Sequence, residues 1–247
     1  MPHNQKNDPG SDLQSSAQQG LEKSLSSKVS NWMRKHYLLL INGLLAIYVF
    51  LPILAPVLMK VGLPQLANPI YKTYRLFCHQ LAYRSFFLFG EQSHYPLELA
   101  GIEGVRSYEE VTGNSGEDQR AAIAFIGNEE LGYKIAFCER DLAIYASLLL
   151  FGLLFSLTKK KWKPLPWLLW ILLALGPIGL DGISQLISRM DIQALSWLGM
   201  RESTPFLRVL SGSLFGWFTA WFGLPSIEEI ANPAPKEIRL ADEGEKR

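Results

Sequence analysis

The stretch from Tyr37 to Met59 reads YLLLINGLLAIYVFLPILAPVLM and holds 23 residues without Asp, Glu, Lys or Arg. A helix of this length is about 34 Å long, and the hydrocarbon core of a bilayer is about 30 Å thick. We therefore predict a transmembrane helix over residues 37–59. Pro52 and Pro56 predict a kink within it, because proline cannot donate a backbone hydrogen bond.

Three more apolar runs follow along the chain, and we predict transmembrane helices over 142–158, 164–188 and 209–227. Tryptophans lie near the ends of the runs, as in the aromatic belts of membrane proteins: Trp32, Trp162, Trp167 and Trp221. Burial inside a soluble protein explains four such runs less well. The predicted fold class is all-α: a polytopic integral membrane helical bundle of about four transmembrane helices, with an extracytoplasmic loop domain.

Basic residues decide the predicted orientation. Lys23, Lys28, Arg34 and Lys35 precede the first run, and Lys159, Lys160, Lys161 and Lys163 separate the second from the third. The positive-inside rule places both groups in the cytoplasm. An even number of spans then puts both termini in the cytoplasm of a multi-pass protein of the cell membrane. Residues 1–30 are predicted to be a disordered cytoplasmic tail, and 228–247 a second cytoplasmic tail.

The outer segments are then 60–141 and 189–208. In the first, Asn68-Pro69 is typical of a helix start. Apolar residues recur there at helical spacing: Leu66, Ile70, Tyr74, Phe77 and Leu81. We expect an amphipathic helix on the outer membrane face that ends at Gly90. A polar loop with short helices should follow, and from Glu129 the chain should be helical into the second span.

Composition limits the partners. The net charge is only +1 over 247 residues, so there is no electrostatic signature for nucleic acid, and membrane lipid is the expected partner. The chain shows no Gly-rich phosphate loop, zinc-protease helix or nucleophile elbow. Gly212, Gly216 and Ala220 form a stripe of small residues in the last run. Such a stripe permits close packing within the chain, or against partner subunits or a second copy in a homo-oligomer.

Asp181 is the single charge in the run 164–188. A charge in a span suggests a site with a partner, although an ordinary helix cap at the water interface is the alternative. Gln185 shares its helix face, and Gly176-Pro177-Ile178-Gly179 can break the helix just before it. Five arginines on the outer side could pair with acidic residues or bind phosphate headgroups: Arg75, Arg84, Arg140, Arg201 and Arg208.

Two cysteines are too few for a disulfide scaffold or an all-thiolate zinc site. Cys138 and Asp141 share a helix face and could bind a metal ion as a cofactor, with His79 or His94 added. Cys78 is adjacent to His79, so in a helix the two side chains diverge by about 100° and rarely bind one ion. A Cys78–Cys138 disulfide and two packed free thiols are the alternatives.

A series of short motifs resembles a known family. The motifs are Phe77-Cys78-His79-Gln80, Arg84-Ser85-Phe86-Phe87, Phe89-Gly90, Cys138-Glu139-Arg140 with Tyr145, Pro177, Asp181-Gly182 with Gln185, Arg201, Ser203-Thr204, Arg208 and Ser211-Gly212. In this order, over roughly residues 68–224, they resemble the prokaryotic membrane proteins catalogued as domain of unknown function 2085.

The resemblance implies a polytopic membrane architecture and a Cys/His/Cys/Cys cluster similar to a metal or redox site. Two features depart from the family. Asp141 stands where its motif Cys-x-Arg-Cys-Thr-Gly-x-Tyr has the second cysteine, and Leu142-Ala143 replaces Thr-Gly. A long insertion also separates Gly90 from Cys138. The resemblance implies candidate positions and no reaction.

The leading functional hypothesis is a non-enzymatic membrane module whose outer-face polar cluster binds an ion, a lipid headgroup or a partner subunit. The alternatives are a membrane thiol-redox or metal-dependent enzyme that uses Cys78 and Cys138, and a small transporter with a broken helix near Pro177. The candidate cluster residues are Cys78, His79, Arg84, Cys138, Arg140, Asp141, Asp181, Gln185, Arg201 and Arg208. The candidate metal ligands among them are Cys78, His79, Cys138 and Asp141.

Overall fold

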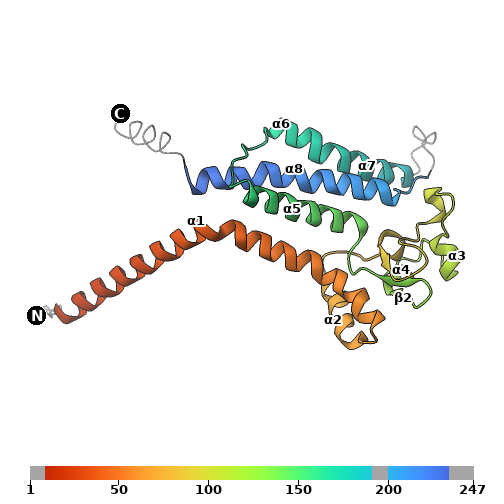
Figure 1. Ribbon diagram of the computed structural model, residues 1–247, viewed down its shortest axis with the longest axis horizontal. Coiled ribbons are helices and arrows are strands. Elements are labelled where there is room, and N and C mark those ends of the chain that lie inside the picture. The colour runs from red at the N-terminus through yellow and green to blue at the C-terminus, as the bar shows by residue number, and fades with distance from the viewer. Residues whose placement is uncertain (1–8, 191–199, 234–247) are drawn as a thin grey trace, which may run out of the picture.

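The computed structural model describes residues 9–190 and 200–233. Four helical rods make up most of it (Figure 1): α1 (Pro9–Lys60), α5 (Glu139–Leu157), a continuous run of α6 (Trp167–Trp170), η3 (Ile171–Leu175) and α7 (Gly176–Arg189), and α8 (Pro205–Ala231). The rod α8 lies between α5 and the α6–α7 rod, and α1 packs against α5. The described part is therefore a helical bundle.

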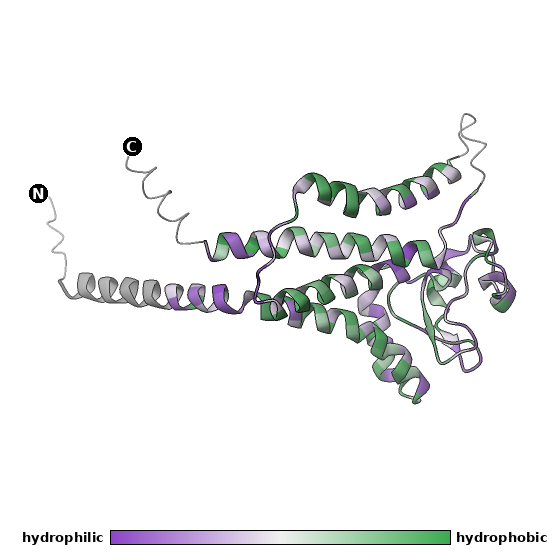
Figure 2. Ribbon diagram, turned by 45° about the horizontal axis from the view of Figure 1, so that its top comes forward, coloured by the Kyte–Doolittle hydropathy of each residue, from purple (hydrophilic) through white to green (hydrophobic). Residues whose placement is uncertain are grey.

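Among the described residues, three helices are long and apolar enough to cross a membrane: Ser27–Lys60, Glu139–Leu157 and Trp167–Ser188. They coincide, to within a few residues at most ends, with three of the four predicted spans, and the first extends ten residues further toward the N-terminus. The fourth, 209–227, lies inside α8. Apolar residues cover much of these rods, whereas polar residues gather in the loops and at the rod ends (Figure 2).

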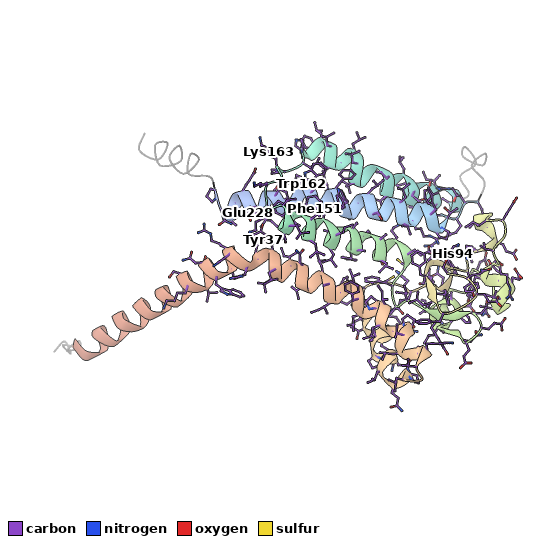
Figure 3. The ribbon with its side chains drawn as sticks, in the orientation of Figure 1. Tyr37, His94, Phe151, Trp162, Lys163 and Glu228 are labelled. Atoms are coloured by element: carbon purple, nitrogen blue, oxygen red, sulfur yellow. The ribbon has the colours of Figure 1, made fainter. Side chains whose placement is uncertain are left out.

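The connections alternate between two ends of the bundle. The segment between α1 and α5 forms a loop domain at one end, where His94 lies, and the link from α5 to α6 is at the other (Figure 3). Aromatic rings fill the second end: Phe151 lies 5.5 Å from Trp162 between ring centroids. Glu228 there accepts a hydrogen bond from the Tyr37 hydroxyl and pairs with Lys160, each at 2.7 Å.

The α6–α7 rod stays helical through Pro177, so the broken helix that the transporter alternative needs is not found in this described rod. Ile171–Leu175 forms a π turn instead. Pro177 has no N–H to donate to the carbonyl of Leu173, four residues earlier. The wider π turn accommodates this missing hydrogen bond without ending the helix.

The loop domain combines short helices with a small sheet. Its elements are α2 (Pro64–Tyr74), η1 (Ala82–Arg84), β1 (Phe87–Leu88), η2 (Glu98–Ala100), α3 (Tyr108–Thr112), α4 (Gln119–Ala124), β2 (Gly127–Asn128) and β3 (Gly132–Lys134). The strands pair antiparallel in the order β1-β3-β2, with Phe87 opposite Lys134 and Gly127 opposite Tyr133. Tyr83, Tyr95 and Tyr108 are buried in its core.

Three expectations about where helices begin and end are wrong, two of them in the loop domain. The amphipathic helix is α2, which begins at Pro64 rather than at Asn68-Pro69 and ends at Tyr74 rather than at Gly90. Gln80 explains the early end: it adopts a left-handed backbone and its buried amide donates to the carbonyls of Tyr71 and Ala136, both at 3.0 Å. This pulls the chain away from the helix axis, so Phe77 and Leu81 are not on the helix.

The other two corrections concern helix bounds. The chain is not helical from Glu129, because β3 forms first and α5 begins at Glu139. A sheet is thus added to the predicted all-α fold. At the N-terminus, α1 begins at Pro9, so residues 9–30 are helical rather than disordered. No proline interrupts the chain between Pro9 and Pro52, and Leu, Gln, Glu and Lys in this stretch favour a helix. The predicted outer loop 189–208 lies largely outside the described residues.

Candidate functional site

Asp181 lies on α7 at the loop-domain end of the bundle, with 7% of its side chain exposed. It forms ion pairs with Arg140 from the first turn of α5 and with Arg201, whose Nη2 lies 3.1 Å from Oδ1. The Ser203 hydroxyl donates to Oδ2 at 2.8 Å. Of the two readings of Asp181 that the sequence left open, the structure thus shows the one with charged partners.

Gln185 completes this group, because its amide donates to the Asp181 carbonyl oxygen at 3.2 Å and to its carboxylate at 3.4 Å. We call Arg140, Asp181, Gln185, Arg201 and Ser203 the Asp181 cluster. Its two guanidinium groups share one carboxylate, and Arg201 also donates to Ser184. The Nε of Arg140 is buried with no hydrogen-bond partner among the described residues. The cluster therefore carries an excess of positive charge and of donor groups.

A groove of about 440 Å³ opens beside the Asp181 cluster, between α7 and α8. Its polar end is formed by Asp181, Arg201 and Ser184. Its remaining wall is mainly apolar and consists of Pro177, Leu180, Leu207, Leu210 and Ser211. The groove therefore combines a charged, hydrogen-bonding end with an apolar wall.

A second ionic group lies deeper in the same end of the bundle. Arg208 of α8 is 2% exposed and contacts Glu139 at 3.0 Å and Glu202 at 2.6 Å. Glu202 also pairs with Arg84 at 2.7 Å. We call Arg84, Glu139, Glu202 and Arg208 the Glu139 cluster. It holds two arginines and two carboxylates, and both carboxylate side chains are fully buried.

Sequence reasoning selected Arg84 and Arg208 but missed Glu139 and Glu202. Both glutamates lie next to predicted span or loop ends, where charged residues are common and carry no special signal.

The small-residue stripe is used within the chain. A Cβ at Gly212 would lie 2.7 Å from the carbonyl oxygen of Arg140, and one at Gly216 would collide with Ile144 and Ser147, all on α5. Ala220 is 1% exposed. The stripe is therefore buried between α5 and α8 within the described part of the chain.

The cysteines meet at the start of α5. The donor atoms of Cys78, Cys138 and Asp141 all lie within 4.8 Å of one another, and both cysteines are free thiols. A hydrogen bond with the Cys78 thiol, together with burial, raises the pKa of the Cys138 thiol well above its ordinary value. We call these three residues the thiol pocket. The exposed His79 is not part of it.

His94, the other histidine considered as a ligand, is also separate from the thiol pocket. Its Nδ1 lies 2.9 Å from the Ser93 hydroxyl in the loop domain. Burial lowers the pKa of His94, and the charge of Arg208 lowers it further. Both effects favour the neutral imidazole.

Lys134 on β3 was not predicted. Its side chain is fully buried and its Nζ donates to the carbonyls of Gln80 and Ile123 at 2.8 Å and of Ala122 at 3.3 Å. Burial lowers its pKa to about 7. A single lysine within the otherwise apolar stretch 131–137 was the signal that could have identified it.

Comparison with known proteins confirms the family resemblance. Residues 130–222 match the model of a family described as a predicted membrane protein, DUF2085. An uncharacterised protein of Methanocaldococcus jannaschii is 26% identical over 206 residues, which cover 80% of this chain and 96% of that protein. No solved structure matches. The matched region contains the whole Asp181 cluster, whereas Cys78 lies before it.

Proposed function

We propose that the protein is a four-span protein of the cell membrane that binds an anionic lipid headgroup in the Asp181 cluster. Both termini are cytoplasmic in this proposal, and the loop domain lies outside. The observation that carries the headgroup assignment is the sharing of the Asp181 carboxylate by Arg140 and Arg201, because Asp181 and Arg201 line the polar end of the groove.

The fourth span is α8. Its 27 residues make a helix about 40 Å long, which exceeds the thickness of a hydrocarbon core. It packs between α5 and the α6–α7 rod, each of which could cross a membrane by itself. A helix packed between two such spans lies at the same depth in the membrane as they do. Lys160, Lys161 and Lys163 lie at the end opposite the loop domain, which by the positive-inside rule is cytoplasmic.

Labelling of single cysteines tests this orientation. In a variant without Cys78 and Cys138, we expect a cysteine at the exposed Ser115 to react with an impermeant maleimide in whole cells. A cysteine at the exposed Lys161 should react only after lysis. The reverse pattern would invert the proposed topology.

The headgroup assignment follows from charge and shape. Arginine binds phosphate through its planar fork of donors, and a phosphate replaces water on guanidinium groups that one carboxylate does not satisfy. The apolar wall of the groove suits an acyl chain, since Leu180 and Leu210 are 75% and 42% exposed. A phospholipid combines both parts.

Native mass spectrometry measures the proposed binding. The detergent-purified protein, given equal amounts of phosphatidylglycerol and phosphatidylcholine, should retain phosphatidylglycerol preferentially. Arg201→Gln should reduce this preference by about tenfold, since one charge-assisted contact contributes roughly 1.5 kcal/mol or more. Arg106→Gln is the matched control, because Arg106 lies in the loop domain with three exposed glutamates.

Two results would count against headgroup binding. One is equal retention of both lipids by the wild-type protein. The other is an equal loss of preference in Arg106→Gln and Arg201→Gln, which would indicate an unspecific effect of net charge.

A further inference from the structure

The thiol pocket is a second site, and it is independent of the proposed headgroup site. Its three residues come from two segments: Cys78 follows α2, whereas Cys138 is the N-cap of α5 and Asp141 lies in the first turn of that helix. Burial of Cys78 and partial burial of the other two separate the pocket from bulk water. We propose that this pocket binds a thiophilic divalent cation, of which Zn²⁺ is the simplest case.

The distances suit a single ion. Zinc binds sulfur at about 2.3 Å and carboxylate oxygen at about 2.0 Å, so tetrahedral ligand atoms lie roughly 3.5–3.8 Å apart. The two sulfurs and the Asp141 oxygen are within 4.8 Å of one another. Small side-chain rotations that move each ligand atom by at most about 1 Å therefore bring the three atoms to the distances of a bound ion.

The chemistry of the ligands selects the class of metal. Two thiolates favour zinc and other soft or borderline cations over Mg²⁺ and Ca²⁺, which prefer oxygen. The carboxylate in turn disfavours Cu⁺, which prefers sulfur ligands. Three protein ligands leave one position of a tetrahedral ion for water or another small ligand.

The surroundings hold the Cys138 sulfur in place. The backbone N–H of Asp141 donates to it at 3.4 Å. A divalent cation displaces the thiol protons when it binds. Aromatic rings pack beside the pocket: Tyr48 lies 4.7 Å from Tyr145 and 5.2 Å from Phe137 between ring centroids. Exclusion of water by these rings strengthens the attraction between the ion and its ligands.

Cobalt binding tests the proposal, because Co²⁺ occupies zinc sites and its bonds to thiolate absorb light. The full-length protein is purified in detergent with a thiol-free reductant, stripped with a chelator and titrated with Co²⁺ and then with Zn²⁺. We expect one Co²⁺ per chain, a cobalt–thiolate absorption band, and loss of that band when Zn²⁺ displaces the cobalt.

Substitutions assign the ligands. Cys78→Ser and Cys138→Ser should each weaken binding by about 100-fold or more and diminish the band, whereas Asp141→Asn should weaken binding by about tenfold and keep the band. Asp141→Glu, which retains the carboxylate, should bind more tightly than Asp141→Asn. His79→Ala is the matched control next to Cys78 and should bind as the wild type does. Helix content measured by circular dichroism identifies any variant that has failed to fold.

Three outcomes would overturn the proposal. The first is a wild-type protein that binds no Co²⁺ through thiolate. The second is a His79→Ala variant that loses binding as strongly as Cys78→Ser. The third is a Cys78–Cys138 disulfide in protein taken directly from cells, because oxidised sulfurs cannot bind the ion.

Discussion

The Glu139 cluster and the Asp181 cluster occupy the same end of the bundle but differ in charge balance. In the first, two arginines meet two fully buried carboxylates, and Arg208 is 2% exposed while Arg84 is 30% exposed. In the second, Arg140 and Arg201 share one carboxylate and remain 24% and 33% exposed. Balanced charges can be withdrawn from water, whereas an excess charge stays near it. The difference indicates that one cluster joins helices and that the other can receive a ligand.

The largest effect is expected from breaking the balanced cluster. Arg208→Met leaves the fully buried Glu139 without its arginine, and an uncompensated buried charge destabilises a protein by about 3–5 kcal/mol. Thermal unfolding in detergent should show a large fall in Tm. Arg106→Met, whose ion pairs are all exposed, should change stability by no more than about 0.5 kcal/mol. Similar Tm values for the two variants would show that the buried Glu139 cluster stabilises the protein no more than the exposed ion pairs of Arg106 do.

Lys134 extends the comparison to a buried ammonium group. Its hydrogen bonds go to three backbone carbonyls, whereas the arginines of both clusters pair with carboxylates. Its pKa is about 7 in the fold and 10.5 when unfolded, so between these values the unfolded chain binds more protons. Stability attributable to this group should therefore rise with pH above 7, by about 2 kcal/mol up to pH 9. Lys134→Met should remove that rise from the dependence of Tm on pH. An unchanged slope would show that Lys134 is not desolvated.

The smallest of the three effects is expected at Asp181. Asp181→Asn leaves Arg140 and Arg201 without a carboxylate, but both arginines reach water, so the loss should be about 1–2 kcal/mol. Because the excess positive charge grows, retention of phosphatidylglycerol should be maintained or increased. Tm and lipid retention are measured on the same preparation. A fall in Tm as large as that of Arg208→Met, or a loss of lipid, would make the two clusters equivalent.

The sequence predicted the helical membrane architecture because long apolar runs leave few alternatives. It also marked Asp181 as a residue that needs a partner, since a lone charge in an apolar run is costly without one, and Arg140 and Arg201 were among the five arginines considered. Glu139 and Glu202 could not be recognised in the same way. Their charges stand among other charges at helix ends, and their burial arises only when α5 and α8 pack together.

The end of α2 shows a different limit. The apolar spacing from Ile70 to Leu81 fits a helix throughout, yet the chain leaves the helix after Tyr74. The deciding contacts join Gln80 to Ala136 and Lys134 to Gln80, more than fifty positions apart in sequence. Periodicity describes local preference and contains no information about such pairings.

The π turn at Ile171–Leu175 also determines the direction in which the polar side chains of α7 point, relative to those of α6. In an uninterrupted α-helix, residues 170 and 181 would point in nearly the same direction, because eleven residues complete about three turns. One wider turn shifts that relation by roughly 100°. Trp170 accordingly donates to Thr219 on α8 at 3.1 Å, while Asp181 pairs with Arg140 on α5. A single rod thus presents one side to its partner helix at the lysine-rich end of the bundle and a different side to its partner helix at the loop-domain end.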